Sequence, residues 1–157
     1  MSLLHVVLVE PEIPQNTGNI ARTCAAVGAR LHLVKPLGFF LGDRHLRRAG
    51  VDYWDATDVV SHDSLETFLS ARRGNSLALF TRNADRTYDR LEWPLREDLY
   101  LVFGKESQGL PPDLIAAHRD QCFRIPMTSG VRSLNLASAA AVVIYDLARR
   151  KGFPGLL

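Results

Sequence analysis

The feature that most constrains the fold is the apolar run at residues 3–9, which reads Leu-Leu-His-Val-Val-Leu-Val. Near-continuous runs of this kind, rich in β-branched residues, are typical of strands buried on both faces of a parallel sheet. A loop with two prolines follows, and residues 17–27 then carry apolar side chains at helical spacing before Gly28 stops the helix. A strand, a loop and a helix in this order predict helices packed on a parallel sheet.

The same alternation continues along the chain. Four further strands are expected, at residues 31–34, 77–81, 99–103 and 122–125. Helices are expected at residues 43–49, 64–72, 111–117 and 133–151, with residues 82–98 as loop and a short element. Five or six strands interleaved with helices predict a three-layer α/β fold with a mostly parallel sheet. The length of 157 residues fits one domain over residues 1–157.

The charge is nearly balanced, at 19 basic against 17 acidic side chains and a formal net charge of +2. Only Lys35, Lys105 and Lys151 are lysines, so the other 16 basic residues are arginines. The planar guanidinium suits bidentate contacts with phosphate, so this composition is compatible with a nucleic-acid partner. It is also usual in proteins encoded by GC-rich genomes, and composition alone favours that second interpretation.

Several classes of function lack their signatures. No Gly-x-Gly-x-x-Gly follows the first strand, and the Gly-Lys-Glu-Ser segment at 104–107 lacks the spacing of a P-loop. The five histidines show no metal-ligand spacing, and Cys24 and Cys122 are interpreted as core residues, so no metal is expected. There is no signal peptide and no apolar run of membrane-spanning length. We therefore expect a cytoplasmic protein with no membrane partner.

Three loops that leave strand ends carry unusual chemistry, at residues 10–19, 104–110 and 126–133. Ligands of open parallel sheets bind beyond the carboxyl ends of the strands. The loops are therefore either the walls of one pocket or ordinary connections, and composition leaves both interpretations open.

Two arginine features also allow two interpretations. Arg22 lies about 200° around its helix from Ile20, off the packed face, and either points to the loop rim or is solvated. The run Arg44-His45-Leu46-Arg47-Arg48, near Phe39 and Phe40, is either a phosphate-contacting patch or a solvated helix face. We slightly favour the patch.

Three ordered segments resemble the motifs of the SPOUT class of RNA methyltransferases. They read Asn-Thr-Gly-Asn-Ile-Ala-Arg at 16–22, Phe-Gly-Lys-Glu-Ser-Gln-Gly-Leu-Pro at 103–111, and Arg-Ile-Pro-Met at 124–127 with Arg-Ser-Leu-Asn-Leu at 132–136. The segments 10–14, 47–53 and 152–155 narrow the resemblance to small enzymes that methylate the ribose 2′-oxygen of cytidine or uridine at wobble position 34 of tRNA. The chain departs from that pattern at Ala137-Ser138, where the family commonly has Ser-Asn.

The resemblance implies a fold and partners. The C-terminal part would thread into a deep trefoil knot, an exception to the rule against knotted chains, and would bind S-adenosylmethionine there. The protein would be a homodimer packed partly through the last helix, with Tyr145 near the interface, and would act on the anticodon stem-loop of tRNA. The alternatives are a SPOUT enzyme acting on another tRNA or rRNA nucleotide, and a non-catalytic RNA-binding dimer.

The resemblance also implies site residues. Arg22 would be catalytic, with Asn16 in support. Since a guanidinium rarely surrenders its proton, Arg22 is expected to stabilise the developing alkoxide rather than to act as a base. The residues expected to bind the cofactor are Phe80, Gly104, Ile125, Met127, Ser133 and Leu134. Those expected to contact the substrate are Glu106, Arg44, Arg47, Arg48 and Arg132.

Overall fold

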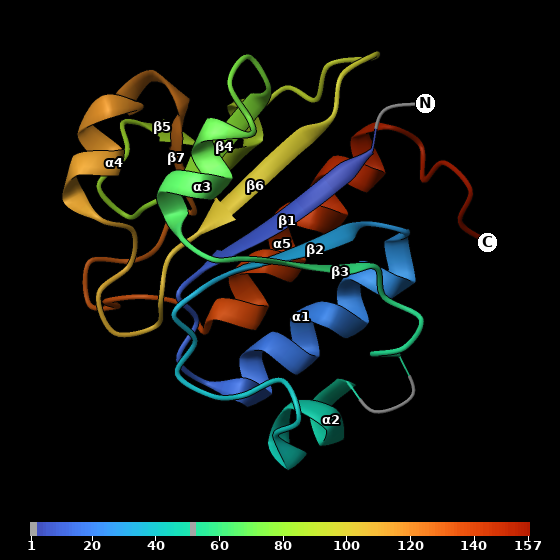
Figure 1. The fold of residues 1–157 in the computed structure, drawn as a ribbon. Helices are drawn as coiled ribbons and strands as arrows, with labels where there is room; N and C mark the ends of the chain where they lie inside the picture. The colour runs from blue at the N-terminus through green and yellow to red at the C-terminus, as the bar shows by residue number, and fades with distance from the viewer. Residues whose placement is uncertain (1–2, 51–52) are drawn as a thin grey trace.

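A computed structural model describes residues 3–50 and 53–157 (Figure 1). The chain forms one seven-stranded sheet in the order β3-β2-β1-β6-β4-β7-β5, and every pairing between these strands is parallel. The strands are β1 (Leu4–Val9), β2 (Arg30–Val34), β3 (Val59–His62), β4 (Ser76–Phe80), β5 (Arg86–Thr87), β6 (Leu99–Phe103) and β7 (Cys122–Arg124). The two central strands β1 and β6 are buried along their whole length, as their unbroken apolar runs predict.

The described residues also form five α-helices and two short 3-10 helices, and all but the last helix lie between strands along the chain. They are α1 (Pro14–Val27), α2 (Arg44–Gly50), α3 (Leu65–Ser70), α4 (Pro112–Ala117), α5 (Leu136–Arg150), η1 (Tyr88–Arg90) and η2 (Arg119–Gln121). Helix α1 begins with a proline, where a missing N–H costs nothing, and ends at Gly28, whose φ of 71° is left-handed. Ser64 caps α3 and Asn135 caps α5 through side-chain oxygens that accept backbone N–H groups.

Alternation along the strands divides the core into two layers. Val6 and Leu8 of β1 belong to the cluster that contains Ile20 of α1 and Ile144 of α5, whereas Val7 belongs to the cluster on the other face. That second cluster includes Phe68 of α3 and Leu114 of α4. Helix α2 packs against the outside of α1 (Figure 1). The predicted three-layer α/β architecture is confirmed, whereas the knot stays a prediction.

Three sequence predictions differ from the structure. Helix α1 begins at Pro14 rather than at residue 17, because proline is well suited to the first helical position, so residues 14–19 lie in its first turns and not in a loop. The prediction missed β3, because its Val-Val-Ser-His sequence lies at the edge of the sheet and is only partly buried. The last helix begins at Leu136 rather than at Ser133, because Asn135 rather than Ser133 provides the cap. Ser133 and Leu134 therefore lie in the loop before α5. Within residues 3–50 and 53–157, no helix is long and apolar enough to cross a membrane.

Candidate active site

The loops that follow β1 and β6 meet at the carboxyl edge of the sheet. These strands are parallel neighbours with Leu8 opposite Phe103, so their carboxyl ends lie together. The backbone N–H and the hydroxyl of Ser107 both donate to one oxygen of Glu12, at 2.9 and 2.7 Å. These two hydrogen bonds favour the carboxylate and lower the pKa of Glu12. A looser ion pair joins Lys105 to Glu10, with Nζ 3.8 Å from Oε1.

The side chain of Glu106, in the loop after β6, reaches toward the start of α1. Its carboxylate accepts the backbone N–H of Glu12 at 2.8 Å and that of Ile13 at 3.2 Å. Helix α1 has no acidic residue in its first turn, and its own N-cap residue, Ile13, provides no side-chain hydrogen bond. Glu106 therefore supplies from another loop the negative charge that stabilises the N-terminus of a helix.

A buried asparagine joins this contact to the third loop. The side-chain amide of Asn16 donates to Glu106 at 3.4 Å, and its oxygen accepts from Nδ2 of Asn135 at 2.9 Å. Asn135 uses its own oxygen to accept the backbone N–H of Ser138 and so caps α5. Glu106, Asn16 and Asn135, together with the Glu12–Ser107 pair, form what we call the edge network. It connects the three motif-bearing loops by hydrogen bonds.

The loop after β6 folds tightly on itself. The N–H of Gly109 donates to the carbonyl of Lys105 at 2.8 Å, and the two residues form an antiparallel bridge. A Cβ atom built on Gly104 would overlap the backbone of Gly109 and Leu110. Only glycine fits at position 104, because the chain returns across the place where a side chain would start.

The residues expected to hold the cofactor fall along three adjacent strands. Phe80 ends β4, Gly104 follows β6 and Ile125 follows β7, and these strands are neighbours in the order β6-β4-β7. The Phe80 ring stacks on that of Phe103, with centroids 4.7 Å apart. Met127 is half-buried, whereas Ser133 and Leu134 are exposed in the loop before α5. The structure thus places all six residues at or beyond the carboxyl edge.

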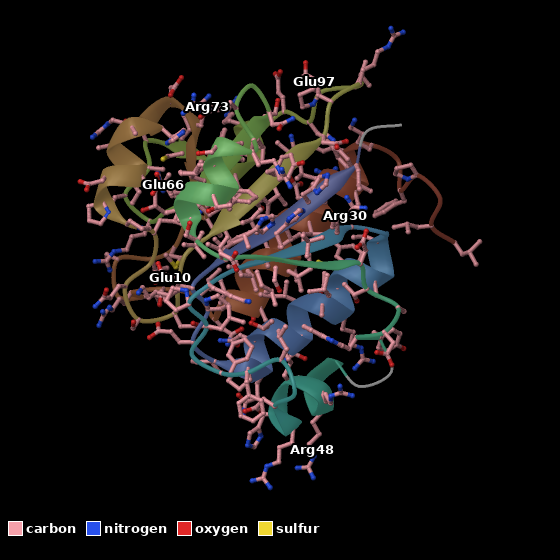
Figure 2. The ribbon with its side chains drawn as sticks, viewed as in Figure 1. Glu10, Arg30, Arg48, Glu66, Arg73 and Glu97 are labelled. Atoms are coloured by element: carbon pink, nitrogen blue, oxygen red, sulfur yellow. The ribbon has the colours of Figure 1, made fainter. Side chains whose placement is uncertain are left out.

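Arg22 lies on the exposed side of α1, as its angular position predicts. Its guanidinium carbon is 5.0 Å from the centroid of the Tyr53 ring. Arg44, Arg47 and Arg48 are all exposed on α2, which packs on α1. Arg48 projects from the far end of the molecule, well away from Glu10 at the sheet edge (Figure 2).

Arg132 is separate from the α2 arginines. It is exposed in the loop between β7 and α5, and its carbonyl accepts a long 3.5 Å hydrogen bond from Arg82. The structure therefore divides the arginines expected to contact substrate into two groups, one on α2 and one in the third motif loop.

A buried chain of histidines was missed by the sequence analysis. Nδ1 of His5 lies 2.8 Å from Nε2 of His32, and Nδ1 of His32 lies 2.8 Å from Nε2 of His62. Nε2 of His5 lies 3.2 Å from Oδ2 of Asp98. The three residues are 27 and 30 positions apart and come from β1, β2 and β3, so no spacing in the sequence could have indicated the contact.

Asp98 determines the direction of every hydrogen bond in this histidine chain. An ionised carboxylate only accepts, so His5 donates through Nε2, and each remaining Nδ1 then accepts from the next Nε2–H. The N–H of Leu3 donates to Asp98 and, as the main cause, lowers its pKa, which keeps it ionised. Burial lowers the pKa of His32 to about 3 and also lowers those of His5 and His62. All three rings are therefore neutral near pH 7.

The histidine chain packs under α3 and takes no part in the edge network. Tyr100 stacks on His5 with ring centroids 4.1 Å apart, and Phe68 meets His62 edge to face. Among the side chains that the structure describes, no group of three or more His, Cys, Asp or Glu residues is arranged to hold a metal ion.

The geometry of the carboxyl edge defines a class of protein. An all-parallel sheet covered by helices, with three hydrogen-bonded loops at its carboxyl edge, is the arrangement of an α/β protein that binds its ligand at that edge. The model of the SpoU rRNA Methylase family matches residues 3–145. The chain belongs to this family, and the resemblance to SPOUT RNA methyltransferases is confirmed.

Three known proteins indicate how far the similarity extends. The tRNA (cytidine(34)-2′-O)-methyltransferase of Escherichia coli (strain K12) is 42% identical over 98% of this chain and 97% of its own length. A solved structure that concerns the 2-OH methylation of C/U34 on tRNA has a TM-score of 0.89 and 46% identity, covering 96% of this chain and 97% of the other. An AdoMet-bound rRNA methyltransferase from Sinorhizobium meliloti has a TM-score of 0.85 and 25% identity, covering 94% of this chain and 56% of its own.

Proposed function

We propose that this protein transfers a methyl group from S-adenosylmethionine to the ribose 2′-oxygen of nucleotide 34, a cytidine or a uridine, in tRNA. The observation that carries the proposal is the edge network, which joins all three motif loops in a chain that aligns end to end with a tRNA (cytidine(34)-2′-O)-methyltransferase. A cytoplasmic location, where tRNA is available, accords with this function.

The residues at the carboxyl edge fit the cofactor. Phe80 and Ile125 are half-buried at neighbouring strand ends, and Leu134 is 39% exposed although it is large and apolar. Such side chains suit the adenine ring and the carbon atoms next to the sulfonium, while the backbone of the loops provides polar groups. We propose that Phe80, Gly104, Ile125, Met127, Ser133 and Leu134 hold S-adenosylmethionine, which supplies an electrophilic methyl group when bound.

Arg22 acts on the attacking oxygen in this proposal. S-adenosylmethionine would supply the methyl group: a bond would form between the ribose 2′-oxygen and the methyl carbon as the carbon–sulfur bond broke, and the hydroxyl proton would pass to solvent water. The positively charged guanidinium stabilises the negative charge that develops on the oxygen. Asn16 and Glu106 contribute by holding the first turn of α1 against the loop after β6. Arg22 lies further along the same helix.

The α2 arginines contact the RNA backbone in this proposal. Arg44, Arg47 and Arg48 are exposed on one short helix, and Phe40, which is 71% exposed, lies shortly before it. Guanidinium groups suit contacts with phosphate, and an exposed aromatic ring beside them suits stacking with a base. Arg132 contacts the RNA from the loop before α5.

A second copy of the chain completes the proposed assembly. Val142 and Tyr145, three residues apart on α5, are 40% and 43% exposed although both are large and apolar. Residues at this spacing share one face of a helix, and a homodimer that packs through α5 would cover them. Sedimentation of the wild type and of the Val142→Glu variant tests this arrangement, because a buried charge would dissociate the dimer.

The test of function is the transfer of label from S-adenosylmethionine to defined tRNA. Unmodified tRNA is compared with the same tRNA carrying 2′-deoxyribose at nucleotide 34, and the labelled nucleotide is mapped. We expect label at nucleotide 34 only, and none with the deoxy substrate. Label at another nucleotide of tRNA or rRNA would show that this nucleotide, rather than nucleotide 34, is the target. RNA binding without methyl transfer would indicate a non-catalytic RNA-binding dimer.

A further inference from the structure

The side chain of Arg22 lies beside an aromatic residue, Tyr53. The Tyr53 ring centroid is 5.0 Å from the guanidinium carbon of Arg22, within the range of a cation–π interaction. Tyr53 is 40% exposed, so one face of its ring can receive the guanidinium. An exposed arginine without such a contact samples many rotamers, and restricting the side chain to one position costs conformational entropy.

The turn that carries Tyr53 is attached to α1 next to Arg22. The hydroxyl of Thr57 lies 2.7 Å from the carbonyl of Tyr53 and 2.9 Å from the carbonyl of Ala21, the residue before Arg22. A hydroxyl has one proton, so the two carbonyls share it. Thr57 is only 8% exposed, so water does not compete freely for this contact.

Two further contacts keep this turn rigid. The N–H of Ala56 donates to the carbonyl of Tyr53 at 3.1 Å, and the N–H of Thr57 donates to that of Trp54 at 3.2 Å. Trp54 is partly buried against the core cluster that contains α1 and α5. The backbone of Tyr53 is therefore held relative to that of α1, next to Arg22.

We propose that Tyr53 is a positioning residue for Arg22: its ring holds the guanidinium in the conformation that meets the ribose 2′-oxygen, and Thr57 holds the turn that carries the ring. This inference rests on the catalytic role proposed for Arg22. The interaction is electrostatic attraction between the cation and the ring face, so an aromatic ring is required and the phenolic hydroxyl is not.

Three variants separate the effect of the aromatic ring on the rate from the effect of side-chain volume. Tyr53→Leu keeps an apolar side chain but removes the ring face, and we expect kcat to fall about tenfold with the KM for tRNA and cofactor within about twofold. Tyr53→Phe keeps the ring and should recover most of the lost rate. Phe153→Leu is the matched control, because Phe153 is 44% exposed on the C-terminal segment after α5. Equal rates for the Leu and Phe variants at position 53 would overturn the inference.

A double-mutant cycle distinguishes failure of this inference from failure of the proposed function. In an Arg22→Ala background, Tyr53→Leu should cause no further loss of rate, because the group that it positions is gone. If Arg22→Ala alone keeps full activity, the proposed role of Arg22 is wrong. If Arg22→Ala lowers the rate strongly and Tyr53→Leu matches the wild type, only the role of Tyr53 is wrong.

A spectroscopic measurement on the wild type needs no variant to fold. The Tyr53 ring current should shift the side-chain protons of Arg22 upfield in the wild type and in Tyr53→Phe, and that shift should vanish in Tyr53→Leu. Random-coil shifts for Arg22 in the wild type would overturn the inference whatever the kinetics show.

Discussion

The side-chain amide of Asn135 donates to the side-chain oxygen of Asn16 at 2.9 Å, across a separation of 119 residues. Asn16 lies in the first turn of α1 and Asn135 caps α5, so one hydrogen bond ties together the starts of the two helices that cover the same face of the sheet. Asn16 is 6% exposed and also donates to Glu106. The side-chain amide of Asn16 therefore links the third motif loop to the other two.

Asn135→Asp tests this link without removing the helix cap. Aspartate caps helices as well as asparagine, so Ser138 keeps its acceptor, but the donor to Asn16 is replaced by an oxygen. We expect a loss of about 1–3 kcal/mol in the free energy of unfolding, measured by urea titration, and a lower kcat. Asn75→Asp, in an exposed turn, is the control. Unchanged stability in Asn135→Asp would mean that the contact contributes nothing.

Arg22→Ala should lower turnover strongly, with a measurable residual rate, while leaving cofactor affinity nearly intact. Removing one group that stabilises a developing oxyanion typically costs about 100-fold or more in kcat. Single-turnover methyl transfer and cofactor titration measure the two quantities separately. Comparable losses of cofactor binding and turnover would contradict a role confined to the reacting oxygen.

Gly104→Ala should disrupt the loop after β6. The added methyl group overlaps the backbone of Gly109 and Leu110, and neither can move as a flexible side chain would, so we expect a loss of about 3 kcal/mol or more. Gly130→Ala is a matched control, because its added methyl group would meet no atom within 4 Å. Thermal unfolding of both variants measures the difference, and similar melting temperatures would mean that the loop is not closed as described.

The histidine chain predicts that stability falls in acid. The pKa of His32 is lowered in the folded protein to about 3, so the unfolded chain binds the extra proton first. The contribution of neutral His32 to the free energy of unfolding is fully present above about pH 6.5 and is lost as the pH falls from there toward 3. The loss amounts to about 2 kcal/mol at pH 5. Protonated His32 would also direct an N–H at the Nε2–H of His62, which breaks that hydrogen bond.

Urea unfolding between pH 7.5 and 5 measures this dependence. The nearby charges of Arg30 and Arg72 lower the pKa of His32 further, and Asp98 opposes the shift only at His5. His32→Leu should be less stable at pH 7.5 but should show a shallower loss toward pH 5. His45→Leu on α2, outside the chain, should keep the wild-type slope, and an identical slope for both variants would contradict this account.

Binding of tRNA should weaken with salt by an amount that reflects a few phosphate contacts. Each contact contributes a slope of roughly −0.7 to −0.9 in the logarithm of affinity against that of salt concentration. Replacing Arg44, Arg47 and Arg48 together by alanine should reduce the magnitude of the slope by about two to three. The triple replacement of Arg73, Arg90 and Arg96, which are exposed outside α2, is the control. An unchanged slope in the α2 variant would remove this helix from the RNA interface.

The elements that were predicted well are specified by a pattern within their own segment, whereas those that were missed depend on contacts with distant parts of the chain. Strand β6 (Leu99–Phe103) matches its predicted range, because an unbroken apolar run has only one stable location in a parallel sheet. Strand β3 was missed because a half-exposed edge strand lacks that pattern. The start of α5 was misplaced because Ser133 and Asn135 are both good caps, and only tertiary contacts select one.

The sequence by itself determined the alternation of buried strands and helices, the order of the three motif loops and the exposed position of Arg22. Only the tertiary structure decided which polar groups meet. Glu106 reaches the first turn of α1, Asn135 reaches Asn16, and the histidines align because β1, β2 and β3 are neighbours in a particular register. Apolar periodicity is a local property of the chain, whereas a hydrogen bond between distant side chains exists only after strand order and register have brought its donor to its acceptor.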